Sequence, residues 1–156
     1  MIVLRRADPA DLEILAPRTL ALNRHEGIAI AEPRLRDALA ELLARPELGG
    51  VWLVEGVAAQ DRSATDEVVG YALVTYGFDL EFGGRDAFLT ELWIDEDARG
   101  RGLGSAALER LCPLLAECGV HALHLQVRPD NPAQRLYSRA GFSLSPRRVM
   151  TRTLIP

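Results

Sequence analysis

The sequence predicts a mixed α+β fold in which helices flank one central sheet, and three observations support this prediction. Short runs of bulky apolar residues alternate with longer runs whose apolar residues recur every three or four positions, the periods of strands and helices. Two of the longer runs begin at an Asp-Pro or Asn-Pro pair, as many helices do. With 156 residues, 48% of them hydrophobic and 26% charged, the chain is long enough to bury a core. We therefore expect residues 1–156 to form a single domain.

The first predicted elements are a strand and a helix. Ile2 to Arg6 is predicted to form the strand. Asp8 then provides an N-cap and Pro9 the first helical position, where a missing N–H costs nothing. Pro17 removes a backbone hydrogen bond further along, so we expect it to kink or end the helix early. Asn23 to Ile30 is predicted to be a loop.

A second helix and two strands follow. The helix is predicted to start at Pro33 and to end before Pro46, with leucines at helical spacing facing inward. Val51 to Val57 and Val68 to Phe78 are predicted strands. The polar run from Ala58 to Glu67 is predicted to form an exposed turn between them.

A strand, a glycine-rich loop and a helix come next. Leu89 to Ile94 is the predicted strand. Helical periodicity begins at Leu103 and stops at Gly119, and Pro113 inside it costs ~3 kcal/mol unless a bend absorbs it. His121 to Val127 is predicted to be a further strand, with alternate apolar residues on one face.

The C-terminal segment is predicted to contain one more helix and two strands. Asn131 is its N-cap, Pro132 its first residue and Gly141 the left-handed residue that closes it. Phe142 to Leu144 and Val149 to Leu154 are predicted to form a closing pair of strands. The whole order gives about six to seven strands with four flanking helices.

The loop from Arg99 to Ser105 is the first candidate for function. It holds three glycines between a strand and a helix. The first four amides of a helix have no internal partner, its N-terminus carries roughly half a positive charge, and glycine lets a phosphate approach the main chain. We interpret this loop as a pyrophosphate cradle. It lacks the lysine of an ATP or GTP loop, and Ser105 stands where a dinucleotide fingerprint needs its third glycine.

Two motifs carry a resemblance to a known family. Arg99, Gly102 and Gly104 form Arg-x-x-Gly-x-Gly, which resembles the acetyl-CoA loop of the GNAT superfamily of N-acetyltransferases. The run from Asn131 to Phe142 resembles that family's N-x-x-A-x-x-L-Y-x-x-x-G-F pattern, with the alanine moved to Ala133. The predicted element order is also the order of this family, whose fold has a single mixed, largely antiparallel sheet.

The resemblance implies a set of residues that bind acetyl-CoA as co-substrate. Main-chain groups of Leu92, Trp93 and Ile94 would contact the pantetheine arm and the thioester. Asn131 would also bond the arm, and Tyr137 would protonate the leaving thiolate. The pyrophosphate would be held by the loop residues Arg99, Gly100, Arg101, Gly102, Leu103, Gly104 and Ser105.

The reaction also needs a base. An amine with a lysine-like pKa of ~10.4 is mostly protonated near pH 7, and deprotonating it costs roughly 4–5 kcal/mol. Glu91 is the candidate, because it is an acidic residue on the strand that precedes the loop. The alternative is that Glu91 is a solvated or salt-bridged strand carboxylate.

A shorter run also resembles one branch of the superfamily. Residues Gly70 to Ile94 are similar to the polyamine (diamine) acetyltransferases in their G-Y-A-L start, their glycine–arginine turn and their acidic strand. The run departs from that branch at Thr90, where the branch has a second acidic residue.

Charge and cysteine content limit the partners. The net charge of −4 argues against nucleic acid and is compatible with a cationic acceptor. No apolar run approaches membrane-spanning length, and the start MIVLRRADPADL lacks the apolar core of a signal peptide, so we expect no membrane partner and a cytoplasmic protein. Cys112 and Cys118 fall in one predicted helix and suggest neither a disulfide nor a metal site.

These observations predict an acetyl-CoA-dependent N-acetyltransferase. It would act on a primary amine of a small molecule, polyamine or amino-acid-like, by direct attack in a ternary complex, since no serine or cysteine constellation indicates a covalent intermediate. The alternatives are acetylation of a protein N-terminus or lysine, and a CoA-binding regulatory module without turnover; a redox dinucleotide domain is a more distant one. The family also implies a possible homodimer.

Overall fold

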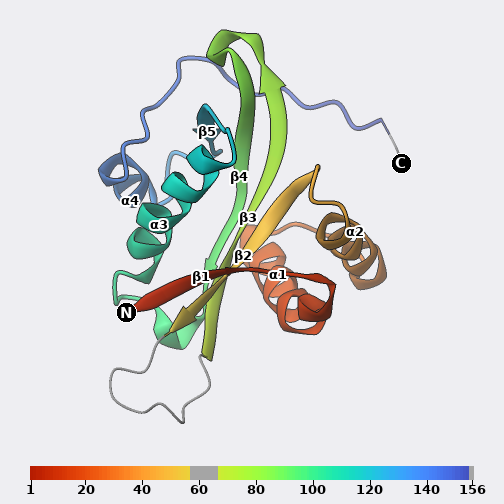
Figure 1. The fold of residues 1–156 in the computed structure, drawn as a ribbon. Coiled ribbons are helices and arrows are strands. Elements are labelled where there is room, and N and C mark those ends of the chain that lie inside the picture. The colour runs from red at the N-terminus through yellow and green to blue at the C-terminus, as the bar shows by residue number, and fades with distance from the viewer. Residues whose placement is uncertain (57–66, 155–156) are drawn as a thin grey trace. The chain divides into compact units, whose positions relative to one another are not determined.

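The computed structural model describes residues 1–56 and 67–154. Within them, five strands form one sheet in the order β1-β2-β3-β4-β5 (Figure 1). Neighbouring strands are antiparallel except β4 and β5, which run parallel. The strands are β1 (Ile2–Arg6), β2 (Gly49–Gly56), β3 (Glu67–Asp79), β4 (Gly84–Ile94) and β5 (Ala122–His124). The α-helices are α1 (Leu12–Glu26), α2 (Glu32–Ala44), α3 (Leu103–Glu117) and α4 (Gln134–Arg139). The predicted fold class, a mixed and largely antiparallel sheet with four helices, is confirmed.

The chain divides into two compact units, residues 1–126 and residues 127–156. The first unit contains the whole sheet and helices α1 to α3, and the second contains α4. The expectation of a single domain over residues 1–156 stays a prediction.

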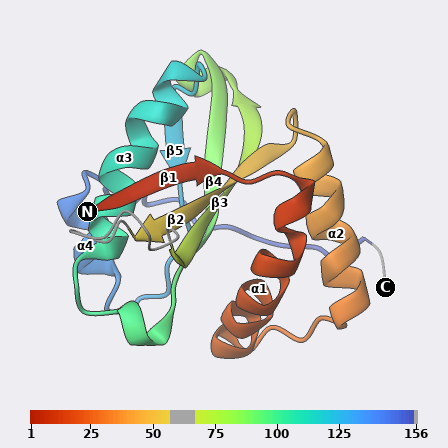
Figure 2. The ribbon, with the colours of Figure 1, turned by 60° about the horizontal axis from the view of Figure 1, so that its bottom comes forward.

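In the first unit, α1 and α2 cover one face of the sheet and α3 covers the other (Figures 1 and 2). On the α1 and α2 side, the buried core consists of Leu15, Ala16, Leu39, Val51, Leu53, Tyr71, Leu73 and Trp93. On the α3 side, Ile2, Val54 and Ala107 are buried, and Leu92 and Ile94 pack against them. Successive residues of β4 therefore serve different faces of the sheet, as the pleat of a strand requires.

Helix α1 continues past the proline that was expected to break it. Pro17 lies inside α1, which reaches Glu26, so the predicted loop start at Asn23 is also wrong. Pro17 is on the exposed side of the helix, where water can bond the carbonyl that loses its partner. The buried side carries Leu15 and Thr19, and the Thr19 hydroxyl bonds back to the main chain. Packing against the sheet thus outweighs the local cost of the proline.

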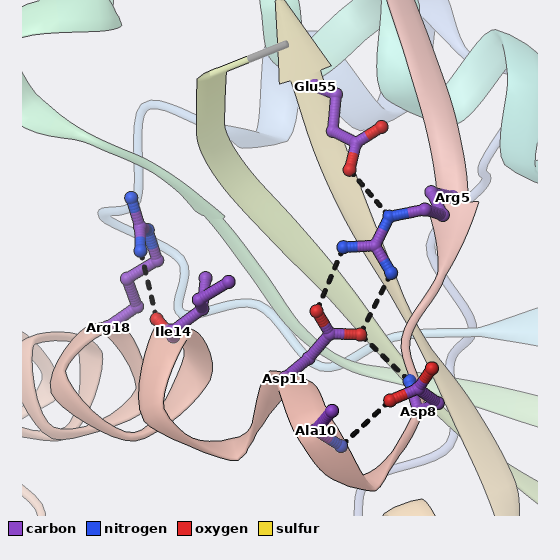
Figure 3. A network of polar contacts seen from close by, with 7 residues as sticks. All are labelled: Arg5, Asp8, Ala10, Asp11, Ile14, Arg18 and Glu55. Carbon is purple, nitrogen blue, oxygen red and sulfur yellow. Dashed lines mark hydrogen bonds and ion pairs between the residues drawn. The ribbon is translucent and has the colours of Figure 1, made fainter. Parts of the chain in front are cut away.

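A partly buried ion network fixes the start of α1 to the sheet (Figure 3). Arg5 Nε donates to Glu55 Oε1 at 2.6 Å, and its two terminal nitrogens donate to the two carboxylate oxygens of Asp11, each at 2.9 Å. Asp11 also accepts the Asp8 N–H at 2.9 Å, while Asp8 accepts the Ala10 N–H at 2.7 Å. The predicted N-cap role of Asp8 is confirmed, although it caps a 3₁₀ turn that precedes α1.

Strand β4 contains an irregularity next to the candidate base. Leu89 lies opposite Val74 and Glu91 lies opposite Leu73, so Thr90 is the extra residue. The Thr90 hydroxyl donates to the Leu73 carbonyl at 3.2 Å. A bulge of this kind changes which face the following residues point to, and here it directs Glu91 to the same side as Leu73.

The last predicted strands differ from the structure. The strand expected from His121 to Val127 is limited to β5, and the pair expected at Phe142 to Leu144 and Val149 to Leu154 is not present in the described residues up to 154. The described sheet therefore has five strands rather than six to seven. Strands form through hydrogen bonds to a neighbouring strand, and apolar content alone could not reveal that this pairing is missing.

Two further boundaries are shifted. The predicted strand from Val51 to Val57 corresponds to β2, which begins at Gly49. The predicted turn from Ala58 to Glu67 lies outside the described residues, apart from Glu67, where β3 begins.

Candidate active site

The loop between β4 and α3 has the geometry of an anion cradle. After a 3₁₀ turn at Glu96–Ala98, Gly100 and Gly102 adopt left-handed conformations with φ of 76° and 75°. A Cβ atom at either glycine would meet no atom within 4 Å. Glycine is therefore needed at these positions for the backbone conformation and not for lack of space.

The main-chain N–H groups of this loop have no hydrogen-bond partner in the described part of the chain. For residues 100–105, no backbone N–H has an acceptor among the residues that the structure describes. The first amide that bonds back is that of Ala106, to the Gly102 carbonyl at 3.1 Å. These six consecutive donors stand at the N-terminus of a 15-residue helix whose first turn contains no acidic residue. Such an arrangement favours a negatively charged group.

The two arginines of the loop bond to carbonyl groups of the preceding segment. Arg99 Nε donates to the Ile94 carbonyl at 2.9 Å, and its guanidinium carbon lies 4.4 Å from the centre of the Trp93 ring. Arg101 donates to the Asp97 carbonyl at 3.0 Å. These contacts hold the loop against the end of β4.

The C-terminal half of β4 has a strand on one side only. Strand β5 pairs with Asp86 to Phe88, whereas β3 pairs with β4 as far as Ile94. Within the described part of the chain, the segment from Leu89 to Ile94 therefore has an open edge beyond the end of β5. An open edge presents main-chain donors and acceptors to an extended ligand. Leu92, Trp93 and Ile94, three of the predicted binding residues, lie in this segment.

The pKa of Glu91 is shifted by its surroundings. Its Oε2 accepts the Tyr71 hydroxyl at 2.5 Å. Burial raises the pKa of Glu91 above its ordinary value, although the bond from Tyr71 opposes this rise. Tyr71 is fully buried, and burial together with the nearby Glu91 charge raises its pKa, so it stays a proton donor. A carboxylate whose pKa lies closer to neutral pH is a better proton acceptor.

Asn131 and Tyr137 lie in the second unit. Asn131 Oδ1 accepts the Ala133 N–H at 2.9 Å, and α4 begins only at Gln134, later than predicted. The Tyr137 ring contacts the Phe142 ring edge to face at 5.9 Å. Residues Glu91 to Ser105 thus belong to the first unit, and Asn131 and Tyr137 belong to the second.

Sequence reasoning missed a network that supports the loop. Arg18 Nη2 donates to Asp95 Oδ2 at 2.7 Å and to the Val68 carbonyl at 2.8 Å. Trp93 Nε1 donates to Asp95 Oδ1 at 2.9 Å. Asp95 therefore joins α1 to the end of β4, directly before the loop. An acidic residue after a strand is a weak signal, because only the folded chain brings Arg18 to it.

Residues 1–56 and 67–154 contain no group of three or more His, Cys, Asp or Glu side chains that could hold a metal ion. No described helix is both long and apolar enough to cross a bilayer.

Comparisons with known proteins point to one family. Residues 19–142 match the family described as "Acetyltransferase (GNAT) family". A mycothiol acetyltransferase from Actinosynnema mirum is 33% identical, over 76% of this chain and 45% of its own length. The chain thus spans less than half of that relative.

Solved structures show the same fold. An integron cassette protein from the mobile metagenome of Cole Harbour Salt Marsh has a TM-score of 0.81 at 31% identity, covering 98% of this chain and 91% of its own. A predicted acetyltransferase from Clostridium acetobutylicum, whose structure was solved with acetyl-CoA, has a TM-score of 0.76 at 19% identity. The alignment with the latter covers 97% of this chain and 96% of its own, and at this identity it shows the fold alone.

Proposed function

The chain belongs to the acetyltransferase (GNAT) family, and we propose that it transfers the acetyl group of acetyl-CoA to a primary amine of a small molecule. The observation that carries this proposal is the run of backbone N–H groups at residues 100–105, which have no acceptor among the described residues and follow a strand with an open edge. A pyrophosphate is the anion that such a helix N-terminus binds well, and an extended arm fits the edge.

We assign the binding of acetyl-CoA to the residues that the motifs predict. Residues 99–105 hold the pyrophosphate, mainly through their main-chain N–H groups. The main chain of Leu92, Trp93 and Ile94 bonds the pantetheine arm and orients the thioester carbonyl. Asn131 bonds the same arm. Membership of the acetyltransferase (GNAT) family supports this choice of co-substrate.

Glu91 is the proposed base. The amine nitrogen attacks the thioester carbon once it has lost a proton, and Glu91 accepts that proton. The raised pKa of Glu91 brings its proton affinity closer to that of the amine, which lowers the cost of the transfer. Tyr71 keeps the carboxylate in one position through its hydrogen bond.

Tyr137 is the proposed acid. When the bond between the acetyl carbon and sulfur breaks, the electron pair leaves with sulfur, and the phenol of Tyr137 supplies the proton that completes the free thiol. The nitrogen of the tetrahedral intermediate loses its remaining extra proton to the Tyr137 phenolate, which restores the phenol. The products are therefore the amide, free CoA and the proton held by Glu91. Both reactants are present together, so the attack is direct and needs no acetylated side chain.

A small-molecule acceptor is favoured over a protein. The relative from Actinosynnema mirum carries the name of a small thiol, mycothiol. A protein N-terminus or lysine remains the second candidate for the acceptor. A regulatory module that binds CoA without turnover is the alternative from another functional class.

The first test is the release of free thiol from acetyl-CoA with a panel of polyamines, amino acids and short peptides. We expect turnover with at least one small amine, and a Tyr137→Phe variant should turn over more slowly while binding CoA normally. Thiol release with peptides only would favour a protein acceptor. If no member of the panel releases thiol but CoA still raises the melting temperature, the CoA-binding module without turnover is favoured.

A further inference from the structure

A second cluster of side chains forms where β4 pairs with β5. The parallel register places Ala122 opposite Asp86 and His124 opposite Phe88. His124 Nε2 lies 3.5 Å from Asp86 Oδ2. The rings of Phe82 and Phe88 each lie 5.1 Å from the His124 ring.

Asp86 is buried without full hydrogen bonding. It is 7% exposed, and its Oδ1 has no hydrogen-bond partner among the described residues. A Cβ at Gly77, the residue opposite, would lie 2.5 Å from this oxygen, so glycine leaves room for the carboxylate. The contact with His124 is longer than an ordinary N–H···O hydrogen bond. A buried carboxylate in this state is costly, and a cation that donates to it would remove the cost.

The surroundings of Asp86 suit an organic cation. Phe82 and Phe88 remain 41% and 38% exposed, which is unusual for large apolar side chains. The His124 side chain is 29% exposed and the Asp86 side chain 10%, so the three rings are accessible from solvent and the carboxylate lies beneath them. Aromatic faces attract ammonium groups, and apolar rings also cover the methylene chain of an alkylamine.

The cluster lies on the same face of the sheet as Glu91. Glu91, Phe88 and Asp86 lie opposite Leu73, Thr75 and Gly77, which are alternate residues of β3. Alternate residues of a strand share a face, and Leu73 belongs to the core under α1 and α2. At ~3.3 Å per residue, Leu73 and Gly77 are about 13 Å apart along β3. The strand positions that carry Glu91 and Asp86 are thus separated by a distance that an extended long-chain diamine can span.

We propose that Asp86, together with Phe82 and Phe88, is a second acceptor subsite that binds the distal ammonium group of a diamine or polyamine. This inference rests on the proposed acetyltransferase function and names its substrate class. The ammonium group donates to the Asp86 carboxylate, the rings flank its methylene chain, and the opposite amino group lies near Glu91.

The kinetic test compares diamines from 1,3-diaminopropane to 1,8-diaminooctane with monoamines of the same length. Wild type should prefer the longer diamines. Asp86→Asn, which keeps the shape and removes the charge, should raise the KM for them about tenfold, the loss expected when a charged hydrogen-bond partner is removed. The KM for monoamines should change little, and so should kcat for diamines and for monoamines. Glu117→Gln, at the exposed end of α3 on the opposite face, removes the same charge and should change neither.

A binding measurement separates this subsite from the proposed reaction. Calorimetric titration of 1,8-diaminooctane into the CoA-bound protein should show weaker binding to Asp86→Asn than to wild type, whether or not turnover occurs. Equal affinities would overturn the subsite, as would equal KM changes for diamines and monoamines. If no amine is acetylated but the affinities differ, the proposed function fails and the subsite stands. Melting temperatures of both variants establish that they are folded.

Discussion

At the scale of single residues, the pair formed by Glu91 and Tyr71 would set the proton chemistry of the proposed reaction. Two effects act on Glu91 in opposite directions: burial favours the neutral acid, and the hydroxyl of Tyr71 stabilises the carboxylate. Burial is the larger effect. The hydrogen bond from Tyr71 therefore orients the Glu91 carboxylate, and burial makes this carboxylate bind a proton more readily than an exposed glutamate does.

A pH profile tests this balance. Glu91→Gln should lower kcat/KM about 100-fold at pH 7.5, the usual range for losing a general base. Tyr71→Phe removes the bond that lowers the Glu91 pKa, so the pKa rises further. Because activity needs the ionised carboxylate, the acid limb of the profile should then move to higher pH. Tyr76→Phe, on the same strand but facing the other side of the sheet, is the control. An unchanged limb in Tyr71→Phe would exclude Glu91 as the titrating base.

At the scale of elements, the start of α3 is the feature that sequence predicted best. The glycines of the loop and the helical periodicity after it are local signals, so the strand, loop and helix could be placed without knowing the rest of the fold. The bulge at Thr90 gave no such signal, because it arises from the register between β3 and β4. The same is true of Asp86 and His124, which are far apart in sequence and meet only through strand pairing.

Two substitutions of Gly102 test whether a negative charge at the start of α3 weakens the binding of CoA. Asp and Asn both tolerate the left-handed conformation of Gly102, so Gly102→Asp and Gly102→Asn carry similar strain. The aspartate adds a negative charge at the proposed phosphate site. We expect it to bind CoA at least about tenfold more weakly than the asparagine variant at low salt, with a smaller difference at high salt. Calorimetry measures both, and equal affinities would refute the cradle.

At the scale of the whole molecule, acid stability should depend on the network around Arg5. The bonds from Arg5 lower the pKa of Asp11 below its ordinary value. A carboxyl group with a lowered pKa in the folded state stabilises the fold above the unfolded pKa of ~3.9 and loses this contribution as pH falls through the folded value. Asp11 is buried but Arg5 is 41% exposed, so solvent screens part of this contribution.

Urea unfolding at two pH values measures this contribution. Asp11→Asn should lower the free energy of unfolding by about 1 to 3 kcal/mol at pH 7, because a buried charged partner of Arg5 is lost. The difference from wild type should shrink as the pH falls from the unfolded pKa of ~3.9 through the lowered folded pKa, because the wild-type carboxyl then takes up a proton itself. The control is Glu13→Gln at the start of α1, which removes an exposed ion-pair partner of Arg36 on α2. It should lower the free energy of unfolding by less than about 1 kcal/mol. A deficit that stays constant with pH would contradict the assignment.

The main sequence-based errors over the whole chain share one physical cause. The break expected at Pro17 and the strands expected after Phe142 both follow from local composition, whereas the outcome depends on what the segment packs against. Helix α1 persists because its buried side lies on the sheet. The C-terminal apolar residues form no described strand, since a strand exists only with a partner.

The loop donors at residues 100–105 belong to the main chain, and this affects how the loop can evolve. Substitutions at Arg101 or Ser105 would have little effect on a ligand that is bound by N–H groups, provided that the backbone conformation is kept. The constraint falls instead on Gly100 and Gly102, which alone carry the left-handed turns of this segment. The Asp86 cluster is the opposite case, because there each side chain contributes chemistry. If both proposals hold, the sequence of the loop outside these two glycines can change during evolution without loss of the ligand, whereas single substitutions in the Asp86 cluster would change the acceptor specificity.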